Sequence, residues 1–142
     1  MAGRLLILIL LIFQVSTAGL AVSAAAGMSH ESSISFAYSM YLYYKFDEQV
    51  LLGMNAGQQQ GGIPMLGSLY MRLPFGSVFM PVFIGDIGYF LHEDDDGVML
   101  KAGGGIDWKN GERSSILLFG GYEKIQGRQG NIYSRVGLLL EF

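Results

Sequence analysis

The feature that most constrains this sequence is an alternation of apolar residues with small or polar ones, repeated at every second position. In the clearest stretch, one face consists of Ile34, Phe36, Tyr38, Met40, Leu42 and Tyr44. Seven stretches show the pattern: 33–46, 49–59, 65–73, 79–89, 98–109, 114–124 and 131–142. Successive side chains of a β-strand point to opposite faces, so the pattern predicts seven strands.

Each predicted strand has an apolar face and an opposite, second face, and the composition of the second face indicates which side of the strands meets water. That face is mostly Ser, Gly, Ala, Tyr and Asn, and charged residues make up only 15% of the chain. A soluble barrel would turn a charged face outward, and this face is too sparsely charged for that role. We therefore expect apolar side chains to face lipid and small or polar ones to face a narrow lumen. A soluble periplasmic lipocalin-like barrel is a more distant alternative.

The strand count requires one more strand, because bacterial single-chain barrels have an even number. The available segment is 19–27, "GLAVSAAAG", although Ala-rich sequence forms strands poorly. We therefore predict an all-β fold: an up-and-down antiparallel transmembrane β-barrel of eight strands, formed by residues 19–142, with seven strands as the alternative.

The first residues have the three-part organisation of a secretory signal peptide. A positive start that includes Arg4 precedes an apolar run and then small residues. We predict a signal peptide over residues 1–18, cleaved after Ala18, with cleavage after Ala26 as the alternative.

Two sets of connections alternate along the chain, and they predict the orientation of the barrel. The segments 46–48, 74–77 and 110–113 read as tight turns, whereas 58–62, 92–97 and 125–130 read as longer polar links. Asn110-Gly111 is a strong hairpin signal. Since transmembrane barrels have short periplasmic turns, the tight set should be periplasmic. An aromatic girdle is expected at that end, formed by Tyr43, Tyr44, Phe79 and Trp108.

The C-terminal strand carries the most specific motif, Arg135-x-Gly137-x-x-Leu140-x-Phe142. With the strand pattern over 33–142, it resembles the OmpA/OmpX-like family of small Gram-negative outer-membrane β-barrel domains. The resemblance implies a location in the cell outer membrane, in contact with its lipid. It also implies that the barrel-assembly machinery reads this last strand as an insertion signal.

Four charged residues fall on the predicted lumen face of four consecutive strands. Asp86, Lys101, Glu123 and Arg135 should form an interior ion network of alternating sign. The expected register places Asp86 opposite Ala102, beside Lys101, and Lys101 diagonal to Glu123. A structural plug is the favoured interpretation, and a gate or proton-linked site is the alternative.

Other features argue against several functional classes. The net charge of −3 provides no basic patch for nucleic acid, and the absence of Cys removes thiol chemistry. The acidic run 92–97 could bind a divalent cation, but a solvated loop is the favoured interpretation. We expect no catalytic, cofactor or metal site, and a monomer that is structural or presents surface loops. The alternative is a small lipid-modifying enzyme using Ser/His chemistry, although no predicted strand places a Ser near His30 or His92.

Overall fold

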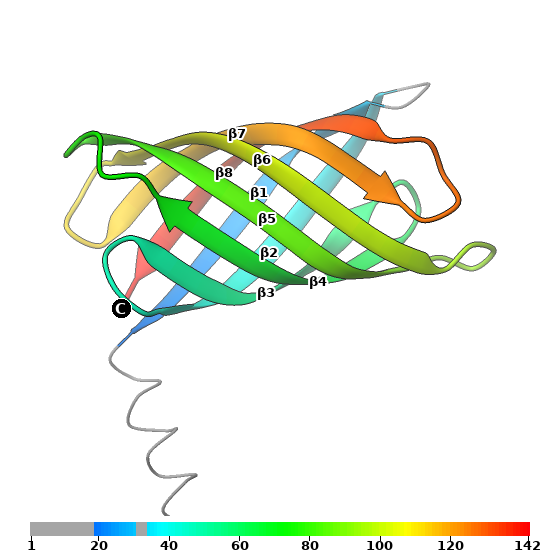
Figure 1. The fold of residues 1–142 in the computed structure, drawn as a ribbon, viewed down its shortest axis with the longest axis horizontal. Coiled ribbons are helices and arrows are strands. Elements are labelled where there is room, and N and C mark those ends of the chain that lie inside the picture. Colours follow the sequence, from blue (N-terminus) through cyan, green and yellow to red (C-terminus); the bar gives the residue numbers. More distant parts are fainter. Residues whose placement is uncertain (1–18, 31–33) are drawn as a thin grey trace, which may run out of the picture.

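The computed structural model describes residues 19–30 and 34–142, which form a closed barrel of eight antiparallel strands (Figure 1). The strands are β1 (Leu20–His30), β2 (Ile34–Lys45), β3 (Val50–Gln59), β4 (Ile63–Arg72), β5 (Phe79–Leu91), β6 (Gly97–Lys109), β7 (Ser114–Ile125) and β8 (Asn131–Glu141). Each strand pairs with the next in the chain, and β8 pairs with β1. The up-and-down antiparallel barrel predicted from the sequence is therefore confirmed. In the described part of the chain, no helix has the length and apolar character needed to cross a membrane.

The predicted inside-out arrangement of the strand faces is also confirmed. Large apolar side chains cover the outside of the barrel, as for Phe36, which is 69% exposed. Most of the opposite positions point inward and are buried. Among the outward strand positions in residues 20–30 and 34–141, Lys124 is the only charged one. A surface of this kind is suited to hydrocarbon rather than to water.

The inferred eighth strand exists as β1, and it extends beyond the predicted segment to His30. Its Ala-rich centre is held by pairing on both sides: Ala24 lies opposite Met40 of β2 and Leu138 of β8. Pairing on both sides therefore overrides a weak local preference. The signal-peptide prediction falls on residues 1–18, outside the described residues. We still propose cleavage after Ala18, because cleavage after Ala26 would remove most of β1.

The connections differ from the sequence prediction in length and in turn type. One end of the barrel carries residues 46–49, 73–78 and 110–113, and the other carries 60–62, 92–96 and 126–130. The predicted contrast between short and long connections is therefore wrong. The left-handed backbone angles expected at Asn110-Gly111 occur instead at Gln60 (φ 49°) and Gly61 (φ 75°). These two residues close the β3–β4 hairpin, because Gln59 bridges to Gly62.

The barrel interior combines bulky side chains with glycines on the neighbouring strands. Tyr43 lies across from Gly53, and Phe119 lies across from Gly105. A methyl group at Gly53 would overlap the carbonyl oxygen of Leu42 on β2. Glycine therefore lets the two strands approach closely and leaves room above for the Tyr43 ring.

This arrangement predicts different effects of two Gly→Ala substitutions. Gly53→Ala should lower the free energy of unfolding in detergent by about 1–3 kcal/mol, because the added methyl group meets backbone. Gly67 points outward, and the nearest atom to a methyl group there would be the Ile87 carbonyl oxygen at 3.5 Å. Gly67→Ala should therefore change stability by less than about 0.5 kcal/mol. Equal effects in urea titrations would show that close strand approach at Gly53 is unimportant.

Candidate functional site

One inward row of paired residues contains three of the four predicted network residues. From β2 to β7 this row consists of Tyr43, Gly53, Ser68, Asp86, Lys101 and Glu123. The expected pairing of Asp86 with Ala102 is wrong, since Asp86 lies opposite Lys101. Directly paired residues share a face, and Ala102 points outward. Lys101 likewise faces Glu123 directly rather than diagonally.

Gln59, which was not among the predicted network residues, is the centre of the hydrogen bonds among them. Lys101 Nζ donates to Gln59 Oε1 at 2.9 Å, and Arg135 Nη2 donates to the same oxygen at 3.3 Å. Gln59 Nε2 donates to Glu123 Oε2 at 3.2 Å. Lys101 Nζ also forms an ion pair with Glu123 Oε2 at 3.6 Å. A neutral amide therefore joins two cations and one carboxylate.

The other two network residues, Asp86 and Arg135, lie in different surroundings. Asp86 accepts a hydrogen bond from Ser68, and no ion pair to Asp86 occurs among residues 19–30 and 34–142. Arg135 donates to the Met28 carbonyl oxygen at 2.7 Å and to Ser29 Oγ at 3.1 Å. The structure thus pairs Lys101 with Glu123, links Arg135 through the Gln59 amide, and leaves Asp86 outside the ion pair.

A second charged cluster, which the sequence pattern did not predict, lies nearer the chain termini. Arg72 Nε binds Asp107 Oδ2 at 2.8 Å, and Arg72 Nη1 binds Glu141 Oε1 at 2.7 Å. The Tyr70 hydroxyl donates to Asp107 Oδ2 at 2.5 Å. All four side chains are more than nine-tenths buried. The cluster joins β4, β6 and β8, which are not neighbours in the sheet, so strand pairing alone could not reveal it.

At the rim of this second cluster, charged side chains reach the solvent. Lys45 Nζ lies 3.7 Å from Glu141 Oε1 and donates to Glu48 Oε1 at 2.9 Å. This hydrogen bond lowers the pKa of the exposed Glu48 carboxyl below its usual value.

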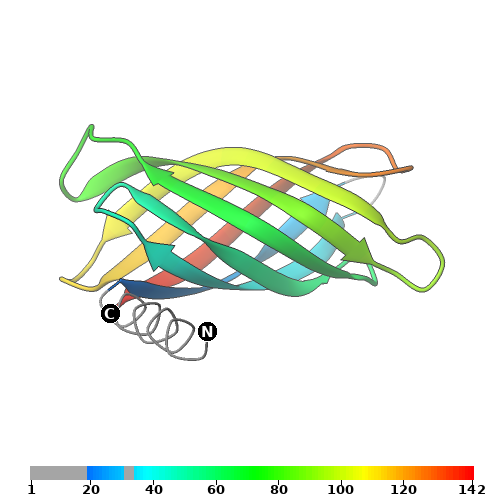
Figure 2. The same ribbon diagram turned by 60° about the horizontal axis from the view of Figure 1, so that its bottom comes forward.

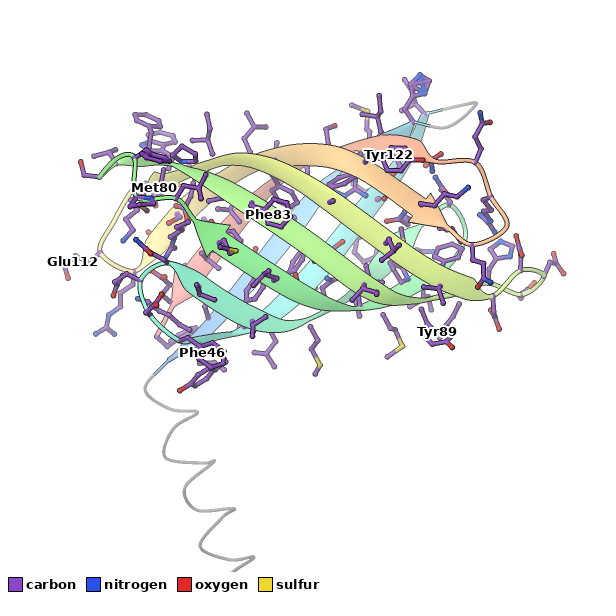
Figure 3. All side chains as sticks on the ribbon, viewed as in Figure 1. Phe46, Met80, Phe83, Tyr89, Glu112 and Tyr122 are labelled. Atoms are coloured by element: carbon purple, nitrogen blue, oxygen red, sulfur yellow. The ribbon has the colours of Figure 1, made fainter. Side chains whose placement is uncertain are left out.

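The predicted girdle residues are divided between the two faces of the barrel. Tyr43 is wrong as a girdle residue, because its side chain is buried in the interior and its hydroxyl lies 3.3 Å from Ser68 Oγ. Tyr44 lies on the outer face in edge contact with Phe46. Phe79 and Trp108 are exposed and stack on each other, with ring centroids 5.8 Å apart. Figure 3 shows Phe46 at this end of the barrel.

The residues of the predicted insertion signal lie on both faces of β8. Arg135 and Gly137 point inward, whereas Leu140 points outward. Phe142 follows the strand with an exposed ring, and its backbone N–H donates to the Leu20 carbonyl oxygen at 2.8 Å. The motif therefore lies where β8 closes against β1.

The histidines and the acidic run lie at the end of the barrel away from the termini. His30 and Ser134 line one outward groove with apolar residues of β1, β2 and β8. This contradicts the expectation that no strand places a Ser near His30. In the acidic run, Asp95 pairs with Arg128 at 3.1 Å. The described residues contain no group of three or more His, Asp or Glu side chains placed to hold a metal ion.

The Lys101–Glu123 pair predicts a characteristic pattern of stabilities. Lys101→Met should lower the free energy of unfolding in detergent by about 3–5 kcal/mol, because Glu123 would retain a buried and unpaired charge. The double variant Lys101→Met/Glu123→Leu should regain part of that loss. Lys124→Met, at an outward position on the neighbouring strand, is the matched control and should have little effect. A double variant less stable than Lys101→Met would contradict the pairing.

Comparison with known proteins identifies the fold. A scan against protein-family models finds no match, and a search of curated proteins finds none. Among solved structures, Neisserial surface protein A superposes with a TM-score of 0.67 at 9% identity, covering 87% of this chain and 96% of that chain. The N-terminal β-barrel domain of Pseudomonas aeruginosa OprF gives 0.63 at 14% identity, with 86% and 97% coverage. The outer membrane enzyme PagL gives 0.55 at 15% identity, with 84% and 98% coverage. The chain, a closed barrel of eight antiparallel strands, therefore has the fold of these β-barrel proteins.

Proposed function

We propose that this chain is a non-enzymatic integral protein of the cell outer membrane, with a lumen closed by its own side chains. The observation that carries the proposal is the outer surface: among the outward positions of the described strands, only Lys124 is charged. A closed barrel satisfies all of its backbone hydrogen bonds internally, as a bilayer requires. The role is structural, or it is the display of the surface connections.

The two charged clusters support a closed lumen. The first contains the buried pair Lys101–Glu123, and in the second the buried Arg72 binds both Asp107 and Glu141. Each cluster therefore brings buried charges of opposite sign together. Ion pairs in a narrow lumen are costly to separate, because an unpaired buried charge costs several kcal/mol. Such clusters fit a plug better than a pore.

Orientation and assembly follow from the position of the strand ends. The first and last strands have their free ends on one side of the barrel (Figure 2). We propose that this side faces the periplasm and that the barrel-assembly machinery recognises β8 through Arg135, Gly137, Leu140 and Phe142. The barrel then functions as a monomer surrounded by outer-membrane lipid.

Membrane fractionation and conductance recordings test the proposal. The protein should remain with the outer membrane after a salt wash and require detergent for extraction. It should also migrate differently on gels before and after boiling, because closed barrels resist unfolding. Reconstituted in planar bilayers, it should produce no steady conductance. Recovery in the soluble fraction would refute the location, and a stable open channel would refute the closed lumen.

A second candidate function is a lipid-modifying enzyme of the same membrane. It is favoured by the outward groove that contains His30 and Ser134, and by the likeness in fold to the enzyme PagL. Ser134 pairs with Met28, so His30 lies two residues further along β1, at diagonal-neighbour distance. A hydroxyl and an imidazole that both face lipid could act as nucleophile and base.

Mass spectrometry of lipid A separates the two candidates. Cells with and without the protein should yield the same lipid A spectrum if the barrel is non-enzymatic. Enzymatic activity would appear as a modified species that disappears with Ser134→Ala and with His30→Ala. His92→Ala, in the β5–β6 connection, is the matched control and should leave such a species unchanged.

A further inference from the structure

The three turns at the end of the barrel that holds the termini differ in chemical character. Residues 46–49 include Asp47 and Glu48, and residues 110–113 include Glu112 and Arg113. The β4–β5 turn, residues 73–78, contains no charged residue. Its Phe75 is nevertheless 77% exposed, and its Val78 is 48% exposed. An apolar turn at the water-facing end of a barrel requires an explanation.

This turn continues the lipid-facing surface of the barrel. Phe79 directly follows it and stacks on Trp108, and Phe83 lies further along the outer face of β5. Figure 3 shows Phe83 on the barrel wall, and Figures 1 and 2 show the turn extending beyond the strand ends. From Leu73 to Gly85 the sequence has no charged residue. The apolar surface is therefore continuous from the wall into the turn.

The turn also has a defined backbone that holds its apolar side chains in place. The Leu73 N–H donates to the Pro81 carbonyl oxygen at 2.8 Å, and the Phe75 N–H donates to the Leu73 carbonyl oxygen at 2.8 Å. A side chain at Gly76 would overlap the Phe79 carbonyl oxygen. The exposed ring of Phe75 is thus presented by a tightly closed turn.

We propose that the β4–β5 turn is a membrane anchor that inserts Phe75 into the boundary between headgroups and acyl chains. Its partner is the phospholipid leaflet nearest the chain termini, because the turn is continuous with the lipid-facing wall. Aromatic and aliphatic side chains favour this boundary, where an apolar surface can be buried by about 5–10 Å. The charged side chains of the other two turns, Asp47, Glu48, Glu112 and Arg113, remain in water. This inference rests on the proposed membrane location.

Site-directed fluorescence can test the anchor, and the absence of Cys from the sequence makes single-site labelling possible. A nitrobenzoxadiazole label is attached to Val78→Cys, which retains Phe75. Glu112→Cys provides a matched label in a charged turn at the same end. Met54→Cys provides a reference label on the barrel wall. Each variant is reconstituted in phosphatidylethanolamine/phosphatidylglycerol vesicles containing a nitroxide lipid labelled near the headgroup, or in plain vesicles with aqueous iodide.

The label at position 78 should lose most of its fluorescence to the nitroxide lipid and little to iodide, and the label at position 112 should do the reverse. In the double variant Phe75→Asp/Val78→Cys, iodide should quench the label at position 78 strongly, because the turn would no longer insert into the membrane. Equal iodide quenching at positions 78 and 112 would overturn the anchor. Protection of the label at position 78 from both quenchers would also overturn it, because that result would indicate contact with protein rather than with lipid. If iodide also quenches the label at position 54, the proposed membrane location fails; if iodide quenches the label at position 78 but not the label at position 54, the anchor alone fails.

Discussion

The physical constraint behind this structure is that a backbone crossing hydrocarbon must satisfy every hydrogen bond within the protein. Strands can do so only if the sheet has no free edge, and here pairing of β1 with β8 removes it. Closure of eight strands creates a narrow interior, which side chains largely occupy in barrels of this size. The paired arrangements of Tyr43 with Gly53 and of Phe119 with Gly105 follow from that limited space.

The same confinement explains how charged residues are accommodated. A buried charge needs a partner, and the partner can lie across the barrel as well as on the next strand. Gln59 shows how a neutral side chain can link charged groups in the barrel interior. Its amide oxygen accepts from Lys101 and Arg135, while its nitrogen donates to Glu123. An aspartate or glutamate at this position could accept from both cations but could not donate to the carboxylate.

The sequence predicted the faces of the strands well, because a period of two determines which side chains share a side. The same rule could have corrected the register, since Asp86 points inward and so cannot pair with the outward Ala102. Contacts across the lumen could not be predicted, because they depend on how far each strand is staggered around the closed barrel. Arg72, Asp107 and Glu141 were each on a predicted inner face, but nothing in their spacing indicated that they meet. Turn lengths were also poorly predicted, because polar residues at 58–59 belong to β3.

The brevity of the connections has a consequence for how the protein meets its environment. At the end away from the termini, the described connections are residues 60–62, 92–96 and 126–130. Segments this short leave little chain beyond the strands that a protease could cleave or that an antibody or phage could bind. Two of them are also tied together, because Asp95 pairs with Arg128. In the orientation proposed above, this end would offer few contacts to the surroundings of the cell, because most side chains of the described strands face either lipid or the barrel interior.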